Sequence, residues 1–349
     1  YWRKIYNPTT TDYKNYFVYI PHRHEEGYGL HSLAIDDFVK QKVDLILTFD
    51  LGITAIEEIE KAKIENIDTI VFDHHLPKID ERTGKDILPC AFAVVDPKRQ
   101  DCNYKDKFLC GAGIAFKLIQ ALFEKYKDFW NLKDGHEKWF LDMAGVATIS
   151  DQVPLLLENR AMAYFGLKVL KKTKRPGVVE LFLKSGLHVS SVGEEDIAFT
   201  LAPRINVASR LADPMLAFEL LSTKDPSKAK ALASELDKIN NDRKKIVANI
   251  MKEVKTILKK RLENEDFVNS KFVVIGNPKW HVGVLGLIAS KILEEYKKTV
   301  FVWGGEDGEI RGSCRASGNV NLVSIMSSLP EGSLINFGGH KSAGGFSVL

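Results

Sequence analysis

Residues 69–75 read TIVFDHH, an apolar run of four residues followed at once by an aspartate and two histidines. The run has the length and the composition of a buried strand. Residues 43–49, VDLILTF, have the same character, and Asp50 follows them directly. In an open parallel sheet, ligands bind outside the carboxyl ends of the strands. The two stretches therefore predict a sheet with chemically active side chains along one edge.

Strands and helices alternate along the first half of the chain. Further strands are expected at residues 16–20 and 91–95, and an amphipathic helix is expected at 53–65. This alternation predicts a parallel sheet with helices on both faces. From Gly111 onward the apolar residues have helical spacing. Helices are expected at residues 111–126, 138–149, 159–171 and 214–221.

Residues 225–262 predict one long helix. Its apolar residues recur at steps of three, four or seven, and Asp225-Pro226 supplies an N-cap and a proline in the first turn. Residues 224–262 hold twelve Lys or Arg against five Asp or Glu, a surplus of seven positive charges. This surplus fits either a solvated helix face or a basic connector beside a nucleic acid.

A second, smaller α/β domain is expected after a polar break at residues 264–270. Its elements would be strands at 271–275, 299–303 and 310–313 and a helix at 284–296. The predicted fold class is α/β: a parallel-sheet domain with a helical extension, a long connecting helix and the second domain. We place these three parts at residues 1–195, 196–265 and 266–349.

Length and composition exclude several classes of protein. The 349 residues are 45% hydrophobic and 27% charged, which excludes a disordered chain, a collagen and a small disulfide-stapled scaffold. No apolar stretch approaches the roughly 18 residues that a membrane span needs. The four cysteines form no C-x-x-C pair, which argues against a zinc site and fits a reducing cytoplasm.

Three carboxylates and two histidines are candidates for a metal site. They are Asp50, Asp73-His74-His75 and Asp151, which follows a predicted helix. Oxygen and imidazole ligands suit Mn²⁺ or Mg²⁺ better than zinc, which favours thiolates. A lone Asp after a strand is often only a helix cap or a turn former. Three metal-competent groups in a row at a sheet opening favour the metal site.

The same residues resemble a known signature. Asp73-His74-His75 resembles the signature of the DHH phosphoesterase superfamily, and residues 338–345, GGHKSAGG, are similar to the glycine-rich GGH motif of the DHH-associated C-terminal domain. Five more stretches narrow the resemblance to RecJ-type single-strand exonucleases. They are residues 20–30 (IPHRHEEGYGL), 96–99 (DPKR), 201–206 (LAPRIN), 280–284 (WHVGV) and 311–315 (RGSCR).

The resemblance implies roles for matched residues. Asp50 would bridge two metal ions, and His74 and Asp151 would complete the coordination of one of them. Asp73 would hold His74 in place, and His75 would contact the scissile phosphate. The implied reaction is two-metal hydrolysis of a phosphodiester with Mn²⁺ or Mg²⁺.

The chain departs from the family pattern at its start. The family begins with a strand that ends in an Asp-x-Asp motif and supplies metal ligands, and no such motif precedes Ile20. Either that segment lies upstream of Tyr1, which the non-Met start favours, or the protein lacks half of the metal site. We expect the chain as given to bind single strands but to cut them poorly. RecJ-type proteins often continue into an oligonucleotide-binding barrel, which would lie beyond Leu349.

Candidate substrate-binding residues share cationic, glycine or aromatic character. Glycine pairs let a backbone approach a phosphate, arginine matches phosphate geometry, and Trp280 could stack on a base. Plain turns, surface ion pairs and a core Trp are the alternative explanations. The candidates are Arg204, Asn206, Arg210, Trp280, His281, Arg311, Ser313, Arg315, Gly338, Gly339 and His340.

The resemblance implies a metal-dependent exonuclease that degrades single-stranded DNA from 5′ to 3′ in DNA repair and recombination. One alternative is a DHH oligoribonuclease or cyclic-dinucleotide phosphodiesterase, although those are shorter and lack residues 20–30 and the long connector. Another is a non-catalytic, DNA-binding replication scaffold, which the missing Asp-x-Asp motif suggests. Expected partners are single-stranded DNA and single-strand-binding or other repair proteins in the cytoplasm, with no membrane.

Overall fold

The computed structural model describes residues 16–22, 29–306, 308–330, 332–339 and 341–348. The chain forms two compact units, Tyr1–Asp237 and Lys238–Leu349. The expected strand at 16–20 is present only as a single bridge residue, Val18. No helix among the described residues is long and apolar enough to cross a membrane.

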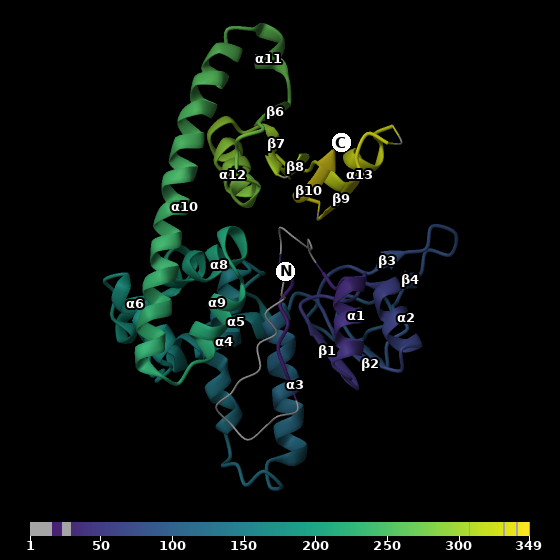
Figure 1. Cartoon of the computed structure of the whole chain (residues 1–349), viewed down its shortest axis with the longest axis vertical. Helices are drawn as coiled ribbons and strands as arrows, with labels where there is room; N and C mark the ends of the chain where they lie inside the picture. Colours follow the sequence, from purple (N-terminus) through teal and green to yellow (C-terminus); the bar gives the residue numbers. More distant parts are fainter. Residues whose placement is uncertain (1–15, 23–28, 307, 331, 340, 349) are drawn as a thin grey trace. The chain divides into compact units, whose positions relative to one another are not determined.

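Three parallel strands form the sheet of the first unit (Figure 1). They are β1 (Leu45–Phe49), β2 (Asp68–Phe72) and β5 (Ala93–Val95), in the order β1-β2-β5. The backbone N–H of Asp50 donates to Phe72 O at 2.9 Å, and that of Asp73 donates to Val95 O at 3.1 Å. The predicted strand ends therefore meet at one edge of the sheet.

Helices cover both faces of this sheet, as the alternation predicts. Successive strand residues point to opposite faces, and the neighbours Val71 and Phe72 belong to different apolar clusters. Val71 packs with α1 (Ser32–Lys40) and α2 (Ile56–Ile64). Phe72 packs with α3 (Gly111–Tyr126), α4 (Leu141–Ser150) and α5 (Leu157–Leu170).

The rest of the first unit is mainly helical, which fits the predicted helical extension. A 3₁₀ turn at His136–Phe140 precedes α4, and a small hairpin joins β3 (Lys78–Ile79) to β4 (Asp86–Ile87). The remaining elements are α6 (Pro176–Lys184), a 3₁₀ turn at Val189–Ser191, α7 (Glu194–Asp196), a π-helical turn at Ile197–Leu201, α8 (Ala202–Leu211) and α9 (Met215–Ser222). The prediction missed α1, α6 and α8.

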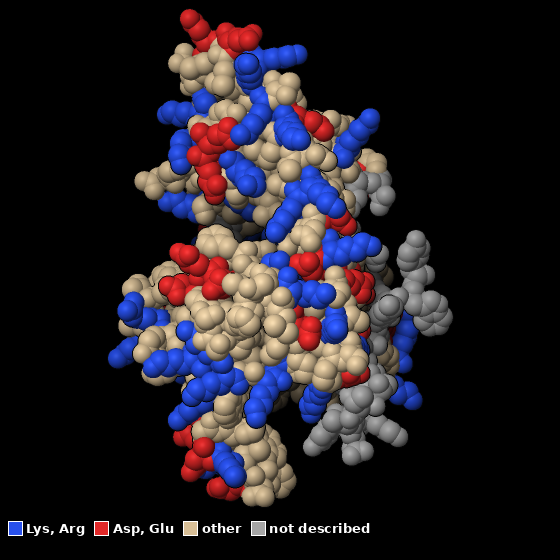
Figure 2. Space-filling view, turned by 90° about the vertical axis from the view of Figure 1, so that its left-hand side faces the viewer, with Lys and Arg blue, Asp and Glu red and all other residues tan. Residues whose placement is uncertain are grey.

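The long helix is a single element, α10 (Pro226–Arg261), and its prediction is confirmed. The Asp225 carboxylate caps it by accepting from the backbone N–H of Ser227 at 2.8 Å. Lys244, Lys252 and Lys259 are exposed, as the apolar stripe requires. Figure 2 shows the face that carries α10, where Lys and Arg side chains are frequent and Asp and Glu side chains lie among them.

The second unit is built on a mixed five-stranded sheet. Its strands are β6 (Phe272–Asn277), β7 (Thr299–Glu306), β8 (Glu309–Arg315), β9 (Asn336–Gly339) and β10 (Ala343–Val348), in the order β6-β7-β8-β10-β9. Only β6 and β7 pair in parallel. The helices are α11 (Glu265–Asn269), α12 (Leu285–Tyr296), which a 3₁₀ turn at Val282–Val284 precedes, and α13 (Leu322–Ser327). The second α/β fold is confirmed, although β9 and β10 were not predicted.

Candidate metal centre

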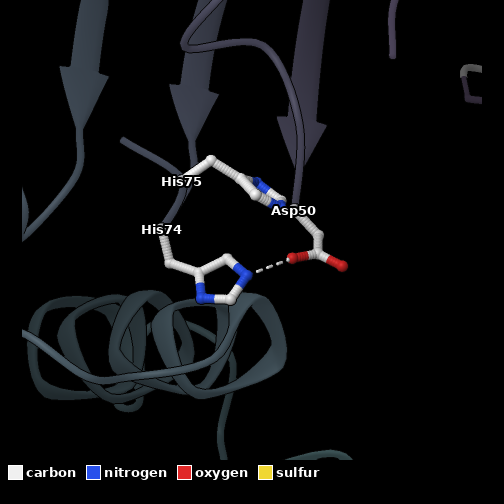
Figure 3. A group of neighbouring side chains, drawn as sticks. All are labelled: Asp50, His74 and His75. Atoms are coloured by element: carbon white, nitrogen blue, oxygen red, sulfur yellow. Dashed lines mark ion pairs between the residues drawn. The ribbon is translucent and has the colours of Figure 1, made fainter. Parts of the chain in front are cut away.

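Asp50, His74 and Asp151 converge at the carboxyl edge of the first sheet (Figure 3 shows Asp50 and His74). The Nε2 atom of His74 lies 2.9 Å from Asp50 Oδ1 and 4.0 Å from Asp151 Oδ2. His75 joins the group, because ligand atoms of Asp50, His74 and His75 all lie within 4.8 Å of one another. Asp151 is the C-cap of α4, so one side chain comes from a helix end and three come from strand ends.

Asp50 has an unusual backbone. Its φ of 66° lies in the left-handed region, which residues other than glycine seldom occupy. Such conformations cost about 1–3 kcal/mol and persist where the surrounding structure enforces them, often at functional sites. Here the turn after β1 brings the carboxylate next to His74.

The Asp73 carboxylate is 1% exposed and organises the Asp-His-His segment. Its Oδ2 accepts from the backbone N–H of Ile53 at 2.9 Å. Its Oδ1 accepts from the backbone N–H of His74 and from the imidazole Nδ1 of His75, both at 2.7 Å. The implied role of Asp73 needs correction: it holds the His75 ring and reaches His74 only through the backbone. The side chain of His74 points to Asp50 instead, and that of His75 turns back to Asp73.

Asp73 and His75 each shift the pKa of the other. Burial alone would raise the pKa of Asp73, but the hydrogen bonds from His75 and from the Ile53 backbone outweigh it, so the pKa is lowered. The hydrogen bond to Asp73 raises the pKa of His75 despite partial burial. Burial raises the pKa of Asp151, and the nearby His74 opposes that rise. His75 is thus stabilised as a cation beside two candidate metal ligands.

The donor set fits a divalent cation. The carboxylates of Asp50 and Asp151 are 62% and 48% exposed, so an ion and a substrate can reach them from solvent. The imidazole of His74 is nearly buried and directs one nitrogen at both of them. Carboxylate oxygens with one imidazole are the ligands expected for Mn²⁺ or Mg²⁺.

The candidate strand-binding residues of the first unit lie on α8. Arg204 is engaged within its own unit: its Nε lies 2.9 Å from Asp237 Oδ1 and its Nη1 donates to Thr200 O at 2.9 Å. Its side chain is only 11% exposed, so the expected phosphate contact is not supported. Asn206 is exposed, and Arg210 is half-buried near the end of α8.

Trp280 is a core residue of the second unit, so the base-stacking expectation is wrong. It is 2% exposed, and its indole N–H donates to Glu253 Oε2 on α10 at 2.9 Å. A large ring that is buried on this scale has no face for a base. His281 next to it is exposed, and its Nδ1 accepts from the backbone N–H of Gly283 at 3.0 Å.

The structure brings together several of the other candidates of the second unit. The antiparallel register aligns Ser313 with Gly345 and Gly338 with Gly345 across three adjacent strands. A Cβ at Gly286, in the first turn of α12, would meet Arg315 Nη2 at 3.1 Å and Ser313 Oγ at 3.2 Å. Gly338 has open space around it.

The remaining two candidates of that unit are less informative. Arg311 lies 3.2 Å from the carboxylate of Glu309, so part of its charge is compensated. His340 lies outside the described residues.

Comparisons with known proteins show which family this chain resembles. Residues 3–148 match the DHH family, N-terminal domain, and residues 268–348 match the DHHA1 domain. The single-stranded-DNA-specific exonuclease RecJ of Bacillus subtilis is 35% identical over 95% of this chain and 39% of its own length. RecJ of Escherichia coli is 33% identical over 94% of this chain and 57% of its own. A crystal structure of exonuclease RecJ bound to manganese superposes with a TM-score of 0.76 at 32% identity, covering 95% of this chain and 77% of that one.

This chain belongs to the RecJ family. Membership confirms the resemblance to the DHH superfamily and the two-domain α/β fold. The chain spans between about two fifths and three fifths of the length of these two curated RecJ proteins.

Two further residues of this RecJ-family chain, Asp96 and Lys98, lie beside the centre; the stretch 96–99 was part of the resemblance, but neither residue was predicted to belong to the site. Asp96 follows β5 as Asp73 follows β2, and it is buried with an Oδ2 atom that has no hydrogen-bond partner in the described part of the chain. Burial raises its pKa to about 6. Its Oδ1 accepts from the backbone N–H of Lys98 at 2.7 Å, and the Lys98 ammonium opposes the rise in the pKa of His75. The sequence feature that could have indicated Asp96 is its position directly after the strand expected at residues 91–95.

Proposed function

We propose that this chain is the catalytic part of a metal-dependent exonuclease that hydrolyses single-stranded DNA from the 5′ end in DNA repair and recombination. The convergence of Asp50, His74 and Asp151 beside a His75 that Asp73 holds carries the proposal. RecJ relatives named single-stranded-DNA-specific exonucleases support the substrate. We assign residues 1–195 to the DHH domain, 196–265 to the connector and 266–349 to the substrate-binding domain.

Asp50, His74 and Asp151 would hold Mn²⁺ or Mg²⁺, and the family resemblance implies that Asp50 would be a ligand of both ions. One nitrogen of His74 lies 2.9 Å from Asp50 Oδ1 and 4.0 Å from Asp151 Oδ2, and manganese is bound in the RecJ structure that resembles this one. A divalent ion bound there supplies an ionised water as nucleophile and offsets the charge of the phosphate during in-line displacement.

His75 would bind the scissile phosphate. The carboxylate of Asp73 fixes its ring through Nδ1, which leaves Nε2 as the donor for a phosphate oxygen. The same carboxylate raises the pKa of His75 and so favours the cationic form that an anionic substrate needs. His75 would therefore orient the phosphate and, in its cationic form, neutralise part of its charge.

The second unit would hold the strand through its phosphates. Arg315 and Ser313 lie against the first turn of α12, where backbone N–H groups favour anions. Gly338 supplies open backbone on β9, whereas Gly339 packs closely against Ala343 and Gly344 of β10. His281 adds an exposed polar side chain and Arg311 a half-buried one. Contacts of this kind position a strand without reading its sequence.

The expected compartment is the cytoplasm. Cys90, Cys102, Cys110 and Cys314 are all free. Burial raises the pKa of Cys110, and that of Cys314 to about 11. Buried thiols of this kind are inert and fit a reducing environment.

Strand degradation under single-turnover conditions tests the proposal. Oligonucleotides labelled at the 5′ or the 3′ end are incubated with excess protein and Mn²⁺. We expect slow mononucleotide release from the 5′ label that EDTA abolishes, because the chain as given has no Asp-x-Asp motif before Ile20 to supply further metal ligands. His75→Ala should lower release about 10²-fold or more, the scale of losing one positioned transition-state contact, while largely sparing binding.

His188→Ala is the matched control, because His188 is an exposed histidine with no site role. An RNA strand tests the oligoribonuclease alternative in the same assay. Tight, metal-independent binding with no release from any strand would contradict the proposed hydrolysis and favour the scaffold.

A further inference from the structure

Gly111 is the first residue of α3, and it lies directly against the side chain of Asp50. A Cβ placed on Gly111 would be 2.5 Å from Asp50 Oδ1, 2.6 Å from its Cβ and 2.7 Å from its Cγ. Real Cβ atoms essentially never make contacts below 3.0 Å. Rotation of the carboxylate could relieve the first contact but not the contact with Cβ, which is fixed by the backbone.

The backbone of Asp50 has little freedom to move away. Its N–H donates to Phe72 O at 2.9 Å, in continuation of the β1–β2 ladder. Three residues later, the N–H of Ile53 donates to the buried carboxylate of Asp73 at 2.9 Å. The left-handed φ of 66° at Asp50 lies between these two anchors. A displaced Asp50 would therefore disturb the segment that holds the Asp-His-His residues.

The start of α3 is anchored as well. Cys110 is the N-cap, and its Sγ accepts from the backbone N–H of Gly113 at 3.4 Å. The same Sγ lies 3.6 Å from Thr148 Oγ1 on α4, and both residues are buried. Neither side of the contact between Gly111 and Asp50 can shift without breaking buried packing.

We propose that Gly111 is a positioning residue of the metal centre: its missing side chain is what lets the Asp50 carboxylate lie beside α3 and face His74 Nε2 at 2.9 Å. The inference rests on the proposed function only in taking Asp50 as a metal ligand. It adds that the ligand geometry depends on a residue 61 positions away that carries no functional group.

A general effect of glycine on helix stability makes the opposite prediction. Alanine is the better helix former, so Gly→Ala in α3 should stabilise the protein wherever space allows. Gly113 supplies the matched control, because it lies in the same turn and its Cβ would meet Met162 Sδ at 3.3 Å and Cys110 Sγ at 3.6 Å. A flexible thioether can yield at that distance.

Mn²⁺ affinity, measured by the EPR signal of the free ion, separates the two glycines. Gly111→Ala should weaken Mn²⁺ binding by roughly tenfold or more, as when the support of a metal ligand is removed. Gly113→Ala should leave it unchanged. Equal Mn²⁺ affinity of Gly111→Ala and the unaltered chain would overturn the proposal.

A double-mutant cycle, measured by melting temperature, tests the proposal even if Gly111→Ala folds poorly. Asp50→Gly removes all three clashing atoms and suits a positive φ. Gly111→Ala should lower the melting temperature in the native background, but not in the Asp50→Gly background. An equal loss in both backgrounds would show that Gly111 packs against something else. An inactive chain that still shows the affinity split would contradict the proposed hydrolysis and leave the role of Gly111 intact.

Discussion

Replacement of Asp73 by Asn tests the reasoning about the Asp-His-His segment, because it removes charge at constant size. The carboxylate is 1% exposed and accepts on both oxygens. Oδ2 takes the N–H of Ile53, and Oδ1 takes the N–H of His74 and the ring N–H of His75. An amide in this place must direct its NH₂ group at one of these donors, whichever way it is oriented.

The expected cost follows from two contributions. A buried donor left without an acceptor costs about 1–3 kcal/mol, and a hydrogen bond to a charged group contributes about 1.5–3 kcal/mol. The side chain of His75 is 39% exposed, so solvent screening favours the lower end of the second range. We expect Asp73→Asn to lower the free energy of unfolding of the first unit by about 3 kcal/mol.

The loss should depend on pH in a defined way. The pKa of Asp73 is lowered, so its stabilisation is present above the ordinary value of 3.8 and is lost as the pH falls through the folded value. The pKa of His75 is raised, so its stabilisation is present below 6.5 and is lost as the pH rises through the folded value. The difference between native and variant should be largest between these two values.

Urea unfolding across that pH range measures the difference, with the melting of the first unit followed separately from that of the second. An NMR titration of the His75 ring should show its pKa lower in Asp73→Asn than in the native chain. Asp44→Asn serves as the control, because Asp44 is exposed and also precedes the site in the chain. A loss below about 1 kcal/mol, the size of one ordinary hydrogen bond, together with an unchanged pKa of His75 would refute the reasoning.

Three further predictions concern substitutions of Lys98, Trp280 and Arg315. Lys98→Met should raise the pKa of His75, because the ammonium opposes the imidazolium; an NMR titration that gives an unchanged value would place Lys98 away from the site. Trp280→Phe should lower the free energy of unfolding by about 1 kcal/mol through loss of the indole hydrogen bond and leave affinity for single-stranded DNA unchanged in fluorescence anisotropy; weaker binding would restore a role in stacking. Arg315→Ala should weaken binding of all sequences alike and reduce its salt dependence, whereas Lys291→Ala, an exposed change of equal charge, should not; equal effects would mean that only net charge matters.

The convergence of Asp50 with the Asp-His-His residues could be predicted from the sequence, because it depends only on where two buried strands end. Parallel strands in register bring their carboxyl ends to the same edge, and the hydrogen bond from Asp50 N to Phe72 O shows that alignment. The long helix α10 could also be predicted from the sequence, since its apolar spacing and its cap are local features. Asp151 was a candidate because it follows a predicted helix, and its role as a ligand came from the family resemblance, because a helix end has no fixed place at the edge of a sheet.

Other features depend on partners that are distant in the sequence. Trp280 and Arg204 looked like ligand contacts because their partners, Glu253 and Asp237, lie 27 and 33 residues away. Local sequence cannot show that such a side chain is already paired and buried. The clearance that Gly111 gives Asp50 is invisible for the same reason, since it appears only when α3 is packed against the end of β1.

The prediction that Asp73 holds the His74 side chain failed for a different reason. His74 and His75 follow it in the chain, and the family pattern does not determine which ring turns back to it. The choice depends on the side-chain torsion of each histidine within the packed site, where His74 faces Asp50 and His75 faces Asp73.

Anomalous diffraction at the manganese edge from Mn²⁺-soaked crystals of this chain tests the central claim most directly. The account predicts a peak within bonding distance of His74 Nε2 and of the carboxylates of Asp50 and Asp151, with the direct contact between His74 and Asp50 replaced by the ion. The His75 ring should remain bonded to Asp73 in the same map. Manganese peaks elsewhere, with His74 still paired to Asp50, would contradict the metal centre.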